Sequence, residues 1–372
     1  MITIKEIFSK KELKQFVTFP FSLYKNHAYW VPPIIKDEVE SFNKKTNPVF
    51  EHADARFFLA FDGNDIVGRI CAIINWQEIN DQKIKKMRFG WYDVIDNTEV
   101  SNMLIAKVKE IAFQNNLEFI EGPVGFSNLD KVGLITEGFD FIGTMITWYN
   151  HPYYVDHLKK LGFKKEKGYL ENKFKYDHSG FSKYEKFSRI VKQRYGLKSL
   201  NFTSTKKILP YTEEMFNLFE KSYSKLSSFV PISQKQKQYF KEKYISFINP
   251  EYIKFVFDDN DNMVGFGIIM PSFSKALQKA KGKLFPFGVY HLLKAKNTSK
   301  DVISYLIGVD PAYQSKGVTA IIFEEYMKVF NQKGVQNFIR TPELEDNTAI
   351  HQLWKSFDSH TFRKRSTFRL DL

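Results

Sequence analysis

The most informative stretch of the sequence is Tyr305–Ala320, YLIGVDPAYQSKGVTA. An apolar strand ends at Asp310-Pro311, a short loop follows, and a helix is expected to begin near Val318. The first N–H groups of a helix have no intrahelical acceptor, and the helix dipole favours an anion beside them. Gly317 lets the backbone approach a phosphate closely, and Lys316 adds positive charge. The stretch predicts a pyrophosphate-binding loop. The alternative is an ordinary strand-to-helix turn with a tolerated glycine.

Two stretches far apart in the chain repeat one pattern. Phe57–Ile70 and Lys254–Ile269 each contain an apolar strand, a tight Asp/Asn turn and a Val-Gly pair that opens a second apolar strand. This pattern is typical of a β-hairpin. Each hairpin is followed by a further strand, an amphipathic helix, a short strand ending in proline, and an Asn turn before another helix. Two copies of one α/β unit explain the repeat better than two unrelated domains.

The loop Gln314–Thr319 resembles that of the GNAT superfamily of acyl-CoA N-acyltransferases, which reads Gln/Arg-x-x-Gly-x-Gly/Ala. Thr319 departs from the last place of that pattern but is still small. The preceding Val309-Asp310-Pro311 and the downstream Asn-bearing segment Glu345–Trp354 also match the family.

The first half resembles a bacterial group of tandem GNAT-like proteins, through the segments Trp30–Pro33, Gly122–Ser127, Glu137–Asp140 and Tyr149–Tyr154. The two resemblances together imply an α/β protein of two tandem GNAT-type domains. Each domain would be a mixed, mainly antiparallel sheet flanked by helices. We expect residues 1–178 to form a domain without the cofactor loop and residues 179–372 to form a domain with it. The charged stretch Lys173–Lys198 is the expected joint.

The resemblance also implies acetyl-CoA, or another acyl-CoA, as cosubstrate. In the family, backbone groups at Ile307, Gly308 and Val309 would bind the pantetheine arm. The loop that would bind the pyrophosphate consists of Gln314, Ser315, Lys316, Gly317, Val318 and Thr319. Asn347, in the downstream turn, is assigned to the same cofactor site.

The corresponding segment of the first half, Tyr92–Val100, contains no glycine. Asp96 and Thr98 are typical helix caps, and Glu99 lies in the first turn, where a carboxylate is favourable. These groups stabilise a helix but repel phosphate. The first copy is therefore expected to keep the fold without the cofactor.

Acyl transfer to an amine requires a base for the ammonium and an acid for the departing thiolate. Many GNAT enzymes place a Tyr on the helix after the Asn turn as that acid. Here the position holds Trp354, whose indole N–H cannot protonate a thiolate, so Trp354 is either a wall for the acyl arm or a core residue. Glu343 and Glu345 are the candidate bases. Exposed turn carboxylates are the plainer interpretation.

The acceptor site is expected between the two halves. The candidate residues lie in the longest insertion of the first half and at its Asn turn: Phe126, Ser127, Asp130, Asn150, Tyr153 and Tyr154. They would fall at the end of the sheet where α/β folds place ligands. Packing between the domains is the equally weighted alternative.

Composition narrows the remaining possibilities. The net charge of +13 suits anionic partners, but the lysines are scattered, and neither a nucleic-acid motif nor a metal-ligand spacing is present. A single cysteine, Cys71, excludes an internal disulfide and indicates a reduced, cytoplasmic setting with a buried thiol. No apolar run is long enough to span a membrane, so we expect no membrane partner.

Three hypotheses for function remain open. The first is an acyl-CoA-dependent N-acyltransferase acting on a small-molecule or peptide amine. The second is a catalytically silent tandem module that binds CoA or a partner. The third is an aminoacyl-tRNA-dependent transferase, which would explain the basic charge but leaves the Gln314–Thr319 loop without a use.

Overall fold

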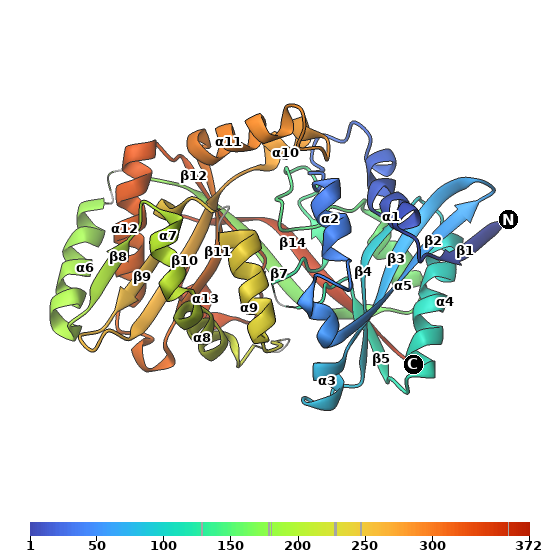
Figure 1. Ribbon diagram of the computed structural model, residues 1–372, viewed down its shortest axis with the longest axis horizontal. Coiled ribbons are helices and arrows are strands. Elements are labelled where there is room, and N and C mark those ends of the chain that lie inside the picture. The colour runs from blue at the N-terminus through green and yellow to red at the C-terminus, as the bar shows by residue number, and fades with distance from the viewer. Residues whose placement is uncertain (128, 178, 180, 227–228, 246–247, 356) are drawn as a thin grey trace.

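The computed structural model describes residues 1–372 except 128, 178, 180, 227–228, 246–247 and 356. Two lobes lie side by side, and one continuous sheet of 14 strands runs through both (Figure 1). Among the described strands, only the pairs β4–β5 and β11–β12 are parallel. The predicted class, two tandem α/β units with mixed, mainly antiparallel sheet, is confirmed.

The first lobe holds the strands β1 (Ile2–Glu6), β2 (Ala53–Asp62), β3 (Asp65–Asn75), β4 (Lys86–Val94), β5 (Phe119–Gly122) and β6 (Leu134–Glu137). Its helices are α1 (Lys10–Leu23), α2 (Ile35–Ser41), α3 (Trp76–Asn80), α4 (Thr98–Gln114) and α5 (Tyr153–Lys160).

The second lobe holds β8 (Lys198–Asn201), β9 (Ile253–Phe257), β10 (Met263–Pro271), β11 (Asp301–Val309), β12 (Asn337–Arg340) and β13 (Glu343–Leu344). Its helices are α6 (Phe181–Tyr195), α7 (Thr205–Ile208), α8 (Thr212–Tyr223), α9 (Gln234–Phe240), α10 (Ser274–Ala280), α11 (Gly288–Thr298), α12 (Val318–Lys333) and α13 (Thr348–Trp354).

The repeated Val-Gly pair has a packing reason. A Cβ added at Gly68 would lie 2.8 Å from Val100 Cγ1 on α4, and one at Gly265 would lie 2.5 Å from Val318 Cγ1 on α12. Each long helix therefore crosses its hairpin at a point where only hydrogen fits on the strand. The two copies share this contact, which supports the predicted repeat.

The last strand of each half lies beside strands of the other half. β14 (His360–Asp371) pairs with β5 on one side and with β7 (Lys164–Lys175) on the other, and β7 then pairs with β12. In Figure 1 the green β7 and the red β14 cross the centre together, and the C-terminus lies in the first lobe. The boundary at 178/179 stays a prediction, since the sheet continues across it.

Buried charges fix the pairing of β7 with β14. Glu171 on β7 lies between Arg363 and Arg365 on β14, and all three side chains are at most 1% exposed. Arg365 Nε donates to Glu171 Oε1, and Arg363 also donates to backbone carbonyls such as Gly138 O at 3.1 Å. A buried carboxylate between two guanidinium groups compensates charges that could not otherwise leave water.

We predict that Glu171→Gln lowers the free energy of unfolding by about 3–5 kcal/mol, because two buried guanidinium groups would lose their counter-charge. The matched control is Glu137→Gln. Glu137 pairs with the neighbouring Lys364 at 3.0 Å, and its side chain is 63% exposed. That loss should be at most about 1 kcal/mol. Urea denaturation followed by circular dichroism measures both, and equal losses would contradict this role of Glu171.

Strand exchange also predicts how fragments behave. Residues 1–178 and 179–372, expressed separately, would each expose unpaired strand edges and should aggregate. Expressed together, they should form a soluble 1:1 complex, which size-exclusion chromatography with light scattering measures. An isolated second half that is monomeric and folded would show that its sheet closes without β7.

Candidate functional site

The parallel strands β11 and β12 separate part of the way along. Their pairing runs from Asp301/Asn337 to Ser304/Arg340, whereas β11 continues to Val309 beside β10. Among the described residues, no strand pairs with that edge of β11 beyond Ser304. The opening therefore leaves one edge of Ile307, Gly308 and Val309 without a strand partner, where the pantetheine arm was expected, although Ile307 O accepts from Tyr223 Oη.

The loop after β11 leaves the start of α12 without a side-chain cap. Gly317 is the N-cap residue in the left-handed region, at φ 84°, and Ser315 lies there as well, at φ 64°. The ammonium of Lys316 lies 4.6 Å from the centroid of the Tyr313 ring, which keeps the charge beside the loop. The helix start thus presents free N–H groups and positive charge together.

The first copy has the same parallel pair but closes its opening with side chains. Tyr153 Oη donates to Val94 O at 2.7 Å, and Val94 N donates to Tyr154 Oη at 3.0 Å. The start of α4 is capped by Asn97, whose Oδ1 accepts from Glu99 N at 2.9 Å. The backbone groups of Val94 and the N–H of Glu99 at the start of α4, which a cofactor would need, are therefore already bonded in this copy.

Glu343 and Trp354 contact each other at the β12 side of the opening. Trp354 Nε1 donates to Glu343 Oε1 at 3.0 Å, and Arg340 forms a bidentate ion pair with the same carboxylate. Burial raises the pKa of Glu343, although Arg340 opposes this. Trp354 is 2% exposed and packs in the second-half core, which favours the core interpretation of this residue.

The other residues of this turn have structural partners. Glu345 pairs with Lys165 at 2.8 Å and lies on the outside. Asn347 caps α13, with its Oδ1 accepting from Ile350 N at 3.2 Å. The roles assigned to these two residues stay predictions.

Two tyrosines that sequence reasoning missed lie at the opening. Tyr223 Oη, at the end of α8, donates to Ile307 O at 3.0 Å, and burial raises the pKa of Tyr223 to about 12. Tyr305 follows Ser304, the last residue of β11 that pairs with β12. Burial raises its pKa, and the nearby charge of Asp130 and the hydroxyl of Tyr223 add to the shift. The separation of two strands is a tertiary feature, so no local signal could have identified these side chains.

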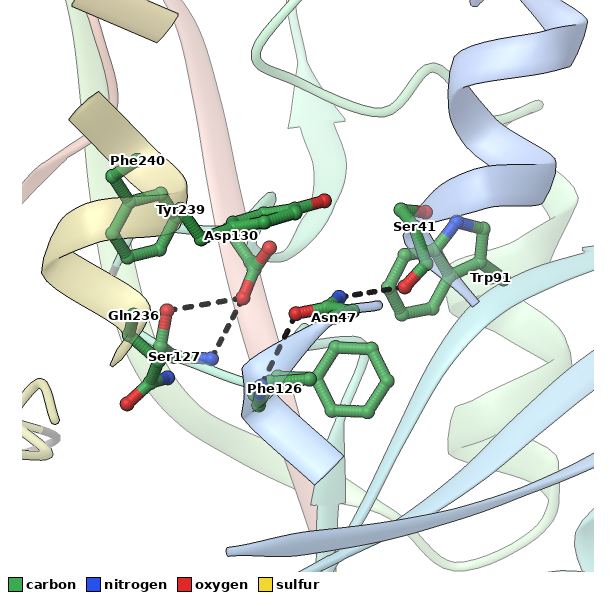
Figure 2. A pocket seen from close by; sticks show the side chains of 10 residues that line it. Ser41, Asn47, Trp91, Phe126, Ser127, Asp130, Gln236, Tyr239 and Phe240 are labelled. Atoms are coloured by element: carbon green, nitrogen blue, oxygen red, sulfur yellow. Dashed lines mark hydrogen bonds between the residues drawn. The ribbon is translucent and has the colours of Figure 1, made fainter. Parts of the chain in front are cut away.

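A small cavity of about 40 Å³ lies between the lobes. Figure 2 shows Phe126, Ser127 and Asp130 of the first half opposite Gln236, Tyr239 and Phe240 of the second. The first half completes the lining with Ser41, Asn47, Val49 and Trp91. The volume admits one or two waters, so a larger acceptor requires the lobes or side chains to move.

Asp130 supplies the carboxylate among the residues that line this cavity. Its Oδ2 accepts from Ser127 N at 2.8 Å and from Ser127 Oγ at 3.0 Å (Figure 2). The carboxylate keeps an opening to solvent, but the surrounding protein limits its hydration and raises its pKa. Leu129, next to Asp130, packs against the same hydrophobic cluster as Tyr223 and Tyr305, so the cavity borders the core beneath the opening of β11.

The expected acceptor residues therefore divide into two groups. Phe126, Ser127 and Asp130 meet at the cavity. Tyr153 and Tyr154 instead fill the first-copy opening, and Asn150 Oδ1 accepts from Ile135 N at 2.6 Å as part of a buried turn. Among the described residues, no group of three or more His, Cys, Asp or Glu side chains could hold a metal, and no helix is long and apolar enough to cross a bilayer. Cys71 is buried, as predicted, and burial raises the pKa of its thiol.

No family model matches the chain. It is 23% identical to Protein YghO of Escherichia coli (strain K12), across 97% of this chain and 93% of that protein. It is 26% identical to a bacterial ceramide synthase of Caulobacter vibrioides, across 82% of this chain and 79% of that protein.

Among solved structures, a tandem GNAT protein from the clavulanic acid biosynthesis pathway superposes with a TM-score of 0.59. That match has 10% identity and covers 100% of this chain and 98% of the other. A GCN5-related N-acetyltransferase from Sphaerobacter thermophilus gives a TM-score of 0.51 at 8% identity, over 100% and 95% of the two chains. The fold of this chain is therefore that of the tandem GNAT proteins.

Proposed function

We propose that the protein is an acyl-CoA-dependent N-acyltransferase that binds one acyl-CoA, in its second half. The observation that carries the proposal is the uncapped start of α12 beside the separated strands β11 and β12. The pyrophosphate would lie at Ser315–Thr319, with the pantetheine arm along Ile307–Val309. The first copy fills both places with its own groups, so it offers no second cofactor site.

The reaction joins the acceptor nitrogen to the thioester carbonyl carbon and breaks the carbon–sulfur bond. The ammonium gives one proton to a base before the attack. The departing thiolate takes a proton from an acid, and the second proton that the nitrogen loses as the amide forms restores that acid. Asp130 suits the first task, since it is partly open to solvent in the cavity and its pKa is raised. Tyr223 suits the second, because its hydroxyl lies at Ile307 O and keeps its proton at neutral pH.

Glu343 fits the role of base less well than the sequence suggested. Its carboxylate already accepts from Arg340 and Trp354, so an amine would have to compete with a guanidinium for the same oxygens. Through its bonds to Arg340 and Trp354, Glu343 is better placed to hold the β12 side of the opening in position. Glu343 and Trp354 would then shape the site without exchanging protons with substrate.

One relative bears on the acceptor. The Caulobacter protein is named a ceramide synthase. Ceramide formation is the acylation of an amine, which is the reaction proposed here. Long-chain amines therefore belong in the acceptor panel beside small polar amines and peptides.

We predict that Gly317→Ala weakens acetyl-CoA binding at least tenfold, roughly the effect of losing one or two charge-assisted hydrogen bonds. An added Cβ would lie 2.8 Å from Val191 Cγ2, and φ 84° is strained for alanine, so the loop must shift. Isothermal titration calorimetry measures the affinity and should give a wild-type stoichiometry near one.

The matched control is Gly334→Ala, at the opposite end of the same helix. Gly334 also has a positive φ, 62°, but its added Cβ would meet only the Lys300 Nζ end at 3.0 Å. This variant should keep wild-type affinity. Equal loss in both variants would mean that general weakening of α12 explains the effect, and a stoichiometry of two would contradict the single-site assignment.

We predict that Tyr223→Phe lowers kcat about 100-fold, the lower range for loss of a general acid, and leaves the acetyl-CoA affinity within about threefold. Tyr211→Phe is the control, because Tyr211 packs against the same core cluster but its ring contacts Phe255 and Phe257 of β9. Thiol release from acetyl-CoA over the amine panel measures turnover. Binding without turnover of any amine would favour a silent module, and transfer only from charged tRNA would favour the third hypothesis.

A further inference from the structure

The insertion between β10 and β11 forms two helices, α10 and α11, that lie along the top of the second lobe and reach the first lobe in Figure 1. One side of the pair packs inward. That buried cluster contains Ile34, Phe273, Ala276, Leu277, Ala280 and Leu292. The insertion therefore forms a small hydrophobic cluster, to which Ile34 of the first half contributes.

Hydrogen bonds hold the insertion to the first half. Ser274 Oγ donates to Gly143 O at 2.7 Å, and Gln278 Nε2 donates to Ala28 O at 2.8 Å. Ile35 N donates to Gly282 O at 2.9 Å. These bonds tie α10 and the turn after it to the first half, and α11 packs into the same cluster through Leu292.

Four exposed apolar side chains lie on α11 and in the segment just before it. Phe285, Phe287, Tyr290 and Leu293 are 77%, 71%, 61% and 53% exposed, and they follow one another within nine residues. Elsewhere in the described part of the chain, large exposed hydrophobic side chains occur singly or in pairs. We call these four residues the apolar face. A gathered apolar surface of this kind marks an interaction site, whereas scattered ones need no explanation.

The surroundings of the apolar face are cationic. Residues 271–300 contain seven lysines and no Asp or Glu. Lys275, Lys279, Lys281, Lys283, Lys294 and Lys300 are exposed. A surface with aromatic and aliphatic side chains between lysines complements anionic headgroups above an acyl layer. A second copy of the chain would face these lysines with the same lysines, which disfavours a symmetric dimer through this face.

We propose that the apolar face and its lysines bind the protein to the surface of an anionic lipid bilayer. The side chains of the apolar face enter the headgroup boundary, and the lysines contact lipid phosphates. Such attachment needs no spanning helix, so it is compatible with the absence of one among the described residues. It departs from the sequence expectation of no membrane partner, which rested on spanning segments alone. The attachment does not require the proposed acyl transfer.

The test is co-sedimentation of the full chain with vesicles, without acyl-CoA. The wild type should bind vesicles of phosphatidylglycerol and phosphatidylcholine at least about tenfold more tightly than vesicles of phosphatidylcholine alone, and salt should weaken the binding. The variant Phe285→Ser/Phe287→Ser/Tyr290→Ser/Leu293→Ser should lose at least about tenfold in affinity. Lys283→Glu/Lys294→Glu should lose a similar factor.

Matched controls lie in the first half. Phe113→Ser removes an aromatic side chain that is 60% exposed on α4, and Lys159→Glu/Lys160→Glu reverses two exposed charges on α5. Both should bind like the wild type. Thermal melts show whether the variants are folded, and exposed positions should melt within a few degrees of the wild type.

Three results would overturn the inference: equal binding to both kinds of vesicle, wild-type binding by the fourfold variant, or no vesicle binding at all. A wild-type dimer in sedimentation equilibrium that the fourfold variant abolishes would assign the face to a second copy instead.

Discussion

The whole molecule depends on the antiparallel ladder between β7 and β14. Neither half has a complete sheet of its own, because β14 lies between β5 and β7, and β7 joins β12. Glu171 between Arg363 and Arg365 fixes this register, since a slip of one residue would leave buried charge without a partner. This ladder joins the two lobes that contain the cavity at Asp130 and the opening of β11. The relative position of the two parts of the site therefore depends on the pairing of β7 with β14.

The two copies share one backbone arrangement but differ in how its free polar groups are satisfied. Both keep the hairpin, the glycine under the long helix and the parallel pair that separates. In the first copy, tyrosine hydroxyls occupy the freed backbone groups and Asn97 caps the helix, so the polar groups are satisfied internally. In the second copy the helix start is left without a side-chain cap. A ligand could supply there the partners that side chains supply in the first copy.

Sequence reasoning succeeded where the signal was local. The hairpins at Phe57–Ile70 and Lys254–Ile269 and the helix at Val318 follow from periodicity and turn residues, and all of them are present. It missed the features that depend on pairing between strands far apart in the sequence. The expected joint began at Lys173, yet Lys173–Lys175 belong to β7, a central strand in which Glu171 finds its partners on β14. Tyr223 and Tyr305 come together only because β11 leaves β12. The cavity-lining residues Phe126, Ser127 and Asp130 were found because aromatic and polar side chains together suit a pocket. Tyr153 and Tyr154 offered the same combination, yet their hydroxyls bond to the backbone of Val94.

The position of β14 also has a consequence for biosynthesis. During translation the first half emerges from the ribosome before residues 360–371 have been synthesised. One edge of β5 therefore stays unpaired while the second half is made. The nascent chain thus exposes a sheet edge until β14 is made, which leaves it open to pairing with strands of other chains during that time. For the same reason, a premature stop near the C-terminus would damage the lobe that was translated first.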